Sequence, residues 1–256
     1  MIRLKTAAEL ASMRRACEVS AGALAAGGAA VRPGATTKDV DDAVEAYIRS
    51  HGGIPNFKGY NGFPAAACVS VGDTVIHGIP AKSHVLQEGD IVSIDTGAIV
   101  EGFHGDNAYT FPCGAISPGA EHLLRTTRAS LFAAIAAAQP GARIGDIGHA
   151  VQSYVEAEGY SVVRDFVGHG VGAELHEAPE VPNFGRAGHG ARLVPGMTLA
   201  IEPMINEKGA AIHILNDGWT VKTKDGGLSA HFEHTVLITA EGPEILTQWQ
   251  VDPWNS

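Results

Sequence analysis

The chain has 256 residues, of which 45% are hydrophobic and 18% are charged, and its formal net charge is −10 with histidine neutral. Such a composition allows a sizeable buried core and excludes an intrinsically disordered chain. The acidic balance argues against direct nucleic-acid binding and against attachment to anionic lipid, because both require a basic surface.

Two helices are predicted near the N-terminus. Thr6 followed by Glu9 has the spacing of a capping box, and apolar residues then recur at helical spacing, so the first helix begins near residue 7 and ends before Pro33. The second helix begins at Thr36 and ends at residues 52–53, where two glycines stop it.

A strand-rich region follows, and then two more helices and further strands. The β-rich runs cover residues 68–71, 91–94 and 103–111. Ser117 followed by Pro118 is typical of a helix N-terminus, and this helix ends before Pro140. Another helix is predicted over residues 145–158, and strands over residues 161–167, 197–201, 219–223 and 230–239, before a short tail at 253–256.

The order of helices and strands occurs twice, and the residues themselves repeat. A shift of 107 positions aligns eight identical residues within 20 positions: Pro33, Gly34, Ala35, Asp39, Ala43, Val44, Tyr47 and Gly52 match Pro140, Gly141, Ala142, Asp146, Ala150, Val151, Tyr154 and Gly159. We therefore predict one α+β domain over residues 1–256 with pseudo-twofold symmetry, whose halves are approximately 1–115 and 116–256. Strands of both halves are expected to meet in the middle, where a site can draw on both.

Neither a membrane span nor a disulfide framework is expected. The longest apolar runs are well under the roughly 18 residues of a transmembrane helix, and the chain has three cysteines, an odd and sparse set. The N-terminus carries charges without an apolar segment between them, unlike a secretion signal. These features predict a cytoplasmic protein.

Two aspartates end up close together if the segment between them is a hairpin. Asp95 follows a strongly apolar run, and Asp106 lies 11 residues later, beyond glycines that allow the chain to turn. Each aspartate alone is explained well enough as a turn or capping residue. Two carboxylates on apolar strands are harder to explain in this way, because unpaired charge is costly on a buried face and a divalent cation is one of its few partners.

Three residues of the second half extend this set. His169 lies between glycines at a strand end, where a histidine is more often a structural residue with its hydrogen bonds made inside the protein than a metal ligand. Glu202 and Glu233 each interrupt an apolar strand. Together with Asp95 and Asp106 they make an oxygen-rich set with one imidazole. Two divalent cations suit it better than one, because four carboxylates around a single ion leave excess negative charge.

Seven blocks of the sequence resemble, in order, the bacterial type I methionine aminopeptidases, from about residue 4 to residue 245. The resemblance implies the pita-bread fold, a pseudo-symmetric antiparallel sheet backed by helices. The blocks are His77-Gly78-Ile79-Pro80, Ile94-Asp95, Gly102-Phe103-His104-Gly105-Asp106, Gly168-His169-Gly170-Val171-Gly172, Leu175-His176-Glu177, Ile201-Glu202-Pro203-Met204 and Phe232-Glu233-His234-Thr235.

The same resemblance implies a role for each residue of the site. Asp95 would bind one metal ion, Asp106 and Glu233 would bridge two, and His169 and Glu202 would complete the second. His77 and His176 would hydrogen-bond the substrate amide and the developing oxyanion, and we expect Glu202 to carry a proton from water to the leaving amine. The methionine pocket would be lined by Phe57, Tyr60, Phe63, Cys68, Leu175 and Trp219. Phe57, Leu175 and Asn107 depart from the usual family pattern.

The activity implied is removal of the initiator methionine from nascent peptides with a small second residue, through a hydroxide that bridges two divalent cations. Co, Mn, Fe and Zn all accept this ligand set. The expected partners are nascent peptide N-termini and, transiently, the ribosome, and the expected state is a monomer. Two alternatives remain: an Xaa-Pro aminopeptidase-like enzyme of the same fold, and a non-catalytic pita-bread protein used for binding.

Overall fold

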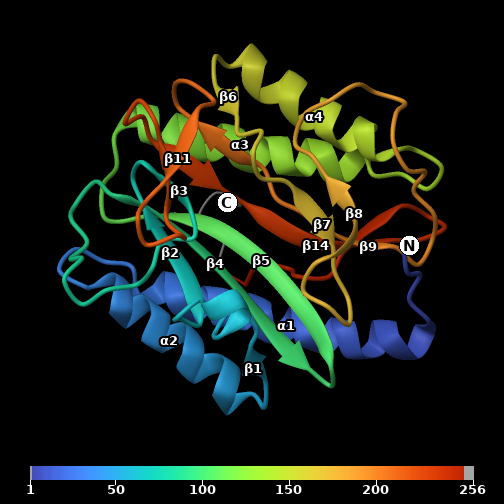
Figure 1. Cartoon of the computed structure of the whole chain (residues 1–256), viewed down its shortest axis with the longest axis horizontal. Helices are drawn as coiled ribbons and strands as arrows, with labels where there is room; N and C mark the ends of the chain where they lie inside the picture. Colours follow the sequence, from blue (N-terminus) through green and yellow to red (C-terminus); the bar gives the residue numbers. More distant parts are fainter. Residues whose placement is uncertain (1, 251–256) are drawn as a thin grey trace.

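The structure is a computed structural model that describes residues 2–250 (Figure 1). Two helix pairs lie on opposite sides of the strands in this view, α1 and α2 below them and α3 and α4 above. The bounds of these helices are Ala7–Ala30 for α1, Thr37–Ser50 for α2, Pro118–Ala137 for α3 and Ile144–Ala157 for α4. All four predicted helices are confirmed.

The helix starts follow from capping residues in the sequence. Thr6 and Glu9 form the predicted capping box of α1, and Thr36 forms the equivalent box of α2 with Asp39. The Ser117 side chain accepts a hydrogen bond from a backbone N–H of α3, which has proline in its first turn. Local chemistry therefore fixes where three of the helices begin.

The strands form one large antiparallel sheet and two small ones. In the nine-stranded sheet the order is β1-β4-β5-β14-β9-β7-β8, with β2 paired to β4 and β15 paired to β14. The small sheets are β13-β10-β6 and β11-β12-β3. The bounds are β1 Ile54–Pro55, β2 Ala67–Val71, β3 Thr74–Ile76, β4 Ile91–Val100, β5 Phe103–Pro112, β6 Ser161–Val162, β7 Gly168–Gly170, β8 Glu177–Val181, β9 Thr198–Ile201, β10 Met204–Asn206, β11 Ile212–Ile214, β12 Val221–Thr223, β13 Ser229–His231, β14 Glu233–Ile238 and β15 Pro243–Ile245, with one short 3-10 helix at Tyr60–Gly62.

Two predicted strands were wrong in extent. The run 161–167 is a strand only at Ser161–Val162, where it pairs with β10. The run 230–239 is divided at Phe232, because β13 pairs with β10 in a small sheet while β14 pairs with β5 and β9 in the large one. Strand β8, which crosses Pro179, was not predicted.

Both halves of the chain contribute to one large hydrophobic cluster. It includes Leu24 and Ile94 from the first half and Leu131 and Val236 from the second, all of them buried. Helix α1 packs on β4 and β5, and α3 packs against β9, β10 and β13.

The predicted α+β fold with a central antiparallel sheet backed by helices is confirmed, whereas the single duplicated domain with the stated half boundaries stays a prediction. The tail at 253–256 lies outside the described residues. No helix within residues 2–250 is long and apolar enough to span a bilayer.

Gly105 allows α1 to approach the strand that carries Asp106. A Cβ at residue 105 would lie 2.5 Å from the backbone nitrogen of Cys17 and 2.6 Å from the Ala16 carbonyl carbon. Replacing Gly105 with alanine is therefore expected to lower the free energy of unfolding by about 1–3 kcal/mol, the usual range for overpacking a core. Urea unfolding measures this. Gly119→Ala is the matched control, because its Cβ meets only Ser117 Oγ at 4.0 Å and the change should be neutral or stabilising.

Candidate metal centre

The register of three strands places three carboxylates on one face of the large sheet. Ala108 of β5 is paired with Asp95 of β4 on one side and with Glu233 of β14 on the other. Asp106 lies two residues before Ala108, so its side chain points to the same face. The hairpin predicted between Asp95 and Asp106 is confirmed, and it turns at Glu101-Gly102.

The sheet opens where these carboxylates lie. Pairing between β5 and β14 covers Glu233 with Ala108 and His234 with Asn107 and then stops. Beyond it the Thr235 hydroxyl donates to the Asp106 carbonyl at 2.8 Å and accepts from the Asp106 N–H at 3.2 Å. A side chain thus replaces the next step of the backbone ladder beside Asp106.

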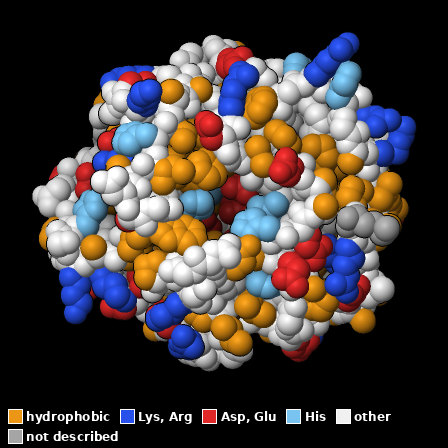
Figure 2. Space-filling view, in the orientation of Figure 1, with side chains coloured by type: hydrophobic (Ala, Val, Ile, Leu, Met, Phe, Trp, Pro, Cys, Tyr) orange, Lys and Arg blue, Asp and Glu red, His pale blue; other side chains and the backbone are white. Residues whose placement is uncertain are grey.

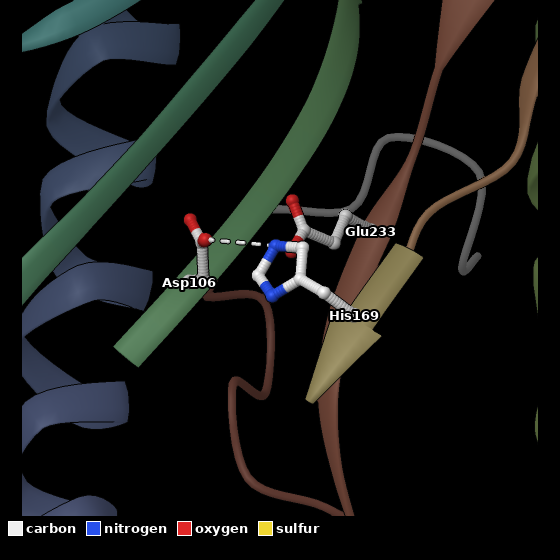
Figure 3. Close-up of side chains that lie close together, drawn as sticks. All are labelled: Asp106, His169 and Glu233. Atoms are coloured by element: carbon white, nitrogen blue, oxygen red, sulfur yellow. Dashed lines mark ion pairs between the residues drawn. The ribbon is translucent and has the colours of Figure 1, made fainter. Parts of the chain in front are cut away.

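His169 of β7 is held in the tautomer that a metal ligand needs. Its Nδ1–H donates to the Gly170 carbonyl at 2.9 Å, which leaves Nε2 without a proton. Nε2 lies 3.8 Å from Asp106 Oδ2 and 3.5 Å from Glu202 Oε1. Figure 3 shows the His169 ring between Asp106 and Glu233, which project from β5 and β14, and ligand atoms of these three residues lie within 4.8 Å of one another.

Glu202 joins the group from the end of β9. Its backbone carbonyl accepts from the Asn183 side chain at 2.9 Å, and its Oε2 lies 3.7 Å from His231 Nε2. Asp95, Asp106, His169, Glu202 and Glu233, predicted from distant parts of the sequence, thus line one cavity.

Burying these carboxylates in ionised form costs free energy unless a cation neutralises them. Asp106 is 3% exposed and Glu233 is 2% exposed. Asp95 Oδ1, Asp106 Oδ1 and Glu233 Oε1 are buried and find no hydrogen-bond partner among residues 2–250. Burial raises the pKa of Asp95 to about 7 and that of Glu202 to about 8, and burial and neighbouring carboxylates raise the pKa of Asp106 and Glu233 well above the ordinary range.

The histidine in this group is neutral. Burial, with the nearby His176 ring, lowers the pKa of His169 to about 3. The contact between His169 and Asp106 is therefore no salt bridge at neutral pH, although the atoms are within 4 Å. Unpaired carboxylate oxygens beside a neutral imidazole with a bare Nε2 are the donor set of a divalent-cation site, so the residues fit the metal that the sequence predicts.

Metal binding is expected to release protons below about pH 8. Because the pKa of Asp95 is about 7 and that of Glu202 is about 8, both carry a proton near pH 6 that a cation must displace, whereas neither does near pH 9.5. Calorimetric titration with Zn²⁺ in two buffers of different ionisation enthalpy measures the proton count. Equal apparent enthalpies in both buffers near pH 6 would contradict the raised pKa values.

The same pKa shifts predict the pH dependence of the metal-free fold. The unfolded carboxyls ionise near pH ~4, while those of folded Asp95 and Glu202 hold their protons to about pH 7 and about pH 8. Burial lowers the pKa of His77 to about 4 and that of His169 to about 3, so these histidines favour the opposite slope up to about pH 6.5. Between about pH 6.5 and about pH 8 the folded state binds more protons, and the free energy of unfolding should fall as the pH rises. Urea unfolding in the presence of a chelator checks the sign.

An apolar pocket opens beside the carboxylates. The cavity has a volume of about 310 Å³, and Figure 2 shows it as a hollow with acidic and histidine side chains inside and hydrophobic side chains around it. Cys68 of β2 is paired with Asp95 of β4, so the apolar wall begins directly next to the carboxylates. All the residues predicted to line the methionine pocket line this cavity, namely Phe57, Tyr60, Phe63, Cys68, Leu175 and Trp219.

His77 and His176 lie on the border between the apolar wall and the carboxylates. The His77 ring meets Phe166 and Trp219 edge-on, at centroid distances of 5.7 and 6.1 Å. His77 has a φ of 57°, a left-handed conformation that is unusual outside glycine, and burial lowers its pKa to about 4. His176 is more exposed, and its ring lies tilted by 58° at a centroid distance of 4.3 Å from the ring of His169. Both predicted histidines thus face the cavity that the ligands line.

The structure adds lining residues that the sequence analysis did not select. Asn61, Ile76, Phe166 and Val167 also line the cavity. His231 was also not selected, and its Nε2 lies 3.7 Å from Glu202 Oε2. The unusual Asn107 faces away from the site, since its side chain donates to Ser20 Oγ of α1 at 2.7 Å.

Known proteins are similar to this chain along nearly its whole length. Residues 11–240 match metallopeptidase family M24. A protein from Clostridium perfringens named methionine aminopeptidase is 53% identical over 247 residues, which are 96% of this chain and 99% of that protein. The crystal structure of methionine aminopeptidase from Thermotoga maritima has a TM-score of 0.95 at 47% identity and covers 96% of this chain and 99% of its own. A prolidase from Pyrococcus furiosus has a TM-score of 0.76 at 25% identity, and the match covers 96% of this chain but 65% of the prolidase.

Proposed function

The chain belongs to metallopeptidase family M24, and we infer that it is a metal-dependent aminopeptidase that removes N-terminal methionine from peptides. Its likeness to methionine aminopeptidase and prolidase structures also establishes the expected pita-bread fold. The observation that carries the catalytic role is the buried group of carboxylates around His169, because bound cations would offset the cost of burying carboxylate oxygens that have no hydrogen-bond partner among residues 2–250.

We propose that two divalent cations bind here. Asp95 would hold one ion, His169 and Glu202 would hold the other, and Asp106 and Glu233 would serve both; Co, Mn, Fe and Zn all suit these donors. Such cations supply positive charge that acidifies water and polarises the scissile carbonyl. The support for two ions is the charge of the site, since four carboxylates exceed what one ion neutralises.

The protein's own groups then handle the protons and the developing charge. Glu202, as a carboxylate, takes the proton from water and delivers it to the leaving amine. His176, at the rim, donates to the oxygen on which negative charge develops, and His77 hydrogen-bonds the substrate amide. Neutral imidazoles can do both, and burial keeps the pKa of each ring low.

The pocket accounts for methionine at the first position. Phe57, Phe63, Cys68 and Leu175 form one buried apolar cluster, with Trp219 packed against it. Phe63 and Trp219 meet edge-to-face at a centroid distance of 5.1 Å. An unbranched thioether fits along such rings and gains sulfur–aromatic contacts, whereas a β-branched side chain collides near its backbone.

The peptides that the site acts on are the N-termini of nascent chains, with a small second residue preferred. We place this activity in the cytoplasm, where initiator methionine is exposed on new chains. Transient association with the ribosome and a monomeric state stay predictions.

Peptide specificity tests the proposed function directly. Met-Ala-Ser should be cleaved much faster than Ala-Ala-Ser or Val-Ala-Ser, because truncation loses roughly 0.8 kcal/mol per buried methylene and branching causes a clash. Met-Ala-Ser should also be cleaved faster than Met-Phe-Ser. Release of the first amino acid, measured as kcat/KM under one metal condition, gives the ratios.

The decisive comparison is with Ala-Pro-Ser. An Xaa-Pro aminopeptidase-like enzyme tolerates alanine first and requires proline second, so faster hydrolysis of Ala-Pro-Ser would overturn the methionine assignment while leaving the metal site intact. No hydrolysis of any peptide by metal-loaded protein would favour a non-catalytic binding protein.

A further inference from the structure

Tyr60 and His176 are joined by a hydrogen bond that the mechanism above does not use. The Tyr60 hydroxyl lies 2.8 Å from His176 Nδ1, and the two rings are tilted by 40° at a centroid distance of 5.4 Å. Within residues 2–250, Nε2 of His176 has no hydrogen-bond partner. A neutral imidazole carries one N–H, and the partner of one nitrogen decides which nitrogen holds it.

Both sides of this hydrogen bond are held by the backbone. Tyr60 sits in a tight turn in which Gly59, Asn61 and Gly62 have φ values of 89°, 47° and 88°. The Tyr60 N–H donates to the Phe57 carbonyl, and the Tyr60 carbonyl accepts from Phe63, each at 2.9 Å. The two rings therefore meet at a set position.

The backbone next to His176 is anchored as well. Glu177 begins β8 and pairs with Gly170 of β7. Its carboxylate accepts from Lys5 Nζ at 2.6 Å, and the Lys5 side chain is 1% exposed. This buried ion pair ties the N-terminal segment to the turn that carries Leu175 and His176.

We propose that Tyr60 is a positioning residue that donates its hydroxyl proton to His176 Nδ1 and so holds the ring as the Nε2–H tautomer. The inference rests on the proposed function, in which His176 must donate a hydrogen bond to the oxygen of the substrate. With Nδ1 occupied as an acceptor, the one proton of the neutral ring stays on Nε2. With the opposite tautomer Nε2 is an acceptor, and the oxyanion would meet a lone pair instead of a donor.

The molecule contains a second pair of the same geometry away from the site. The Tyr160 hydroxyl lies 2.7 Å from His122 Nδ1, with centroids 5.5 Å apart and rings tilted by 41°. There the opposite nitrogen, Nε2, lies 3.3 Å from the Glu158 carboxylate, which can only accept from it. With one ring proton, placed on Nε2 toward Glu158, Nδ1 of His122 accepts from Tyr160, the same arrangement that we assign to His176. Tyr160→Phe is therefore a matched control for Tyr60→Phe.

The test measures the ring state and turnover in the same variants. Long-range 1H–15N spectra of histidine-labelled full chain, metal-free and loaded with diamagnetic Zn²⁺, should show His176 as the Nε2–H tautomer, and Tyr60→Phe should shift both ring nitrogens toward a mixture. For Met-Ala-Ser, Tyr60→Phe should lower kcat by about 2- to 10-fold, the worth of one neutral hydrogen bond, with KM changed less than about twofold. Tyr160→Phe should move the His122 signals only and leave kcat unchanged.

Three outcomes overturn the proposal: a proton on Nδ1 of His176 in the unaltered chain, unchanged His176 nitrogen shifts in Tyr60→Phe, or a loss of activity that appears in KM alone. The last outcome would make Tyr60 a pocket wall only. If the unaltered, metal-loaded chain releases no methionine, the proposed function fails together with the catalytic part of this inference, while the tautomer assignment is still decided by the spectra.

Discussion

Replacing Asp106 or Glu233 with alanine should abolish methionine release and metal binding together. Each carboxylate lies on the shared face of the sheet, and ligand atoms of both come within 4.8 Å of each other and of His169. Since bound cations are worth several kcal/mol to hydrolysis, we expect kcat/KM for Met-Ala-Ser to fall by at least ~10³-fold. Elemental analysis of the purified variants measures the loss of metal.

Glu180→Ala is the matched control for this loss. Glu180 is paired with His169 across β7 and β8, yet its side chain is exposed, so it is an acidic neighbour outside the buried group. Its removal should change neither metal content nor kcat/KM. An Asp106→Ala or Glu233→Ala variant that keeps its full metal content and full activity would show that the assignment of bridging ligands is wrong.

Replacing His77 or His176 with alanine should leave metal content intact and lower kcat by roughly 10²-fold or more. This is the usual effect of deleting a positioned proton donor or an oxyanion partner. Measuring metal content and kcat on the same preparations separates binding from turnover.

His77→Asn is a second variant that protects this test from misfolding. Because His77 has a φ of 57°, alanine is strained at this position, whereas asparagine tolerates the left-handed region. If the alanine variant is unstable, the asparagine variant should fold normally and still lose turnover. Loss of metal in His176→Ala would instead make that histidine a ligand, and our division of the site would be wrong.

Local signals in the sequence were sufficient to predict the helices and the types of residue that make up the site. The N-cap residues Thr6, Thr36 and Ser117 bind the first turn of the helix that each one begins. No contact with a distant part of the chain is needed to predict them. Asp95 stood out because it follows an apolar run, and Glu233 because it interrupts an apolar strand. These features depend on neighbours along the chain, and a single sequence displays them.

Apart from the hairpin between Asp95 and Asp106, the sequence could not determine which strand lies beside which. The run 230–239 is divided at Phe232 because its first part pairs with β10 and its second part pairs with β5. The proximity of His231 to Glu202 and the Tyr60–His176 hydrogen bond, which joins residues 116 positions apart, are likewise contacts between distant segments. Composition and periodicity carry no record of such contacts, because they depend on register between segments that meet only when the sheet closes.

The sequence by itself thus determined that this protein has an α+β fold and which acidic residues and histidines it has for chemistry. The tertiary structure decided that Asp95, Ala108 and Glu233 are aligned across three strands and that Thr235 ends the ladder beside Asp106. The physical reason is that a strand pattern fixes which face a side chain takes, while only strand register fixes its neighbour on that face.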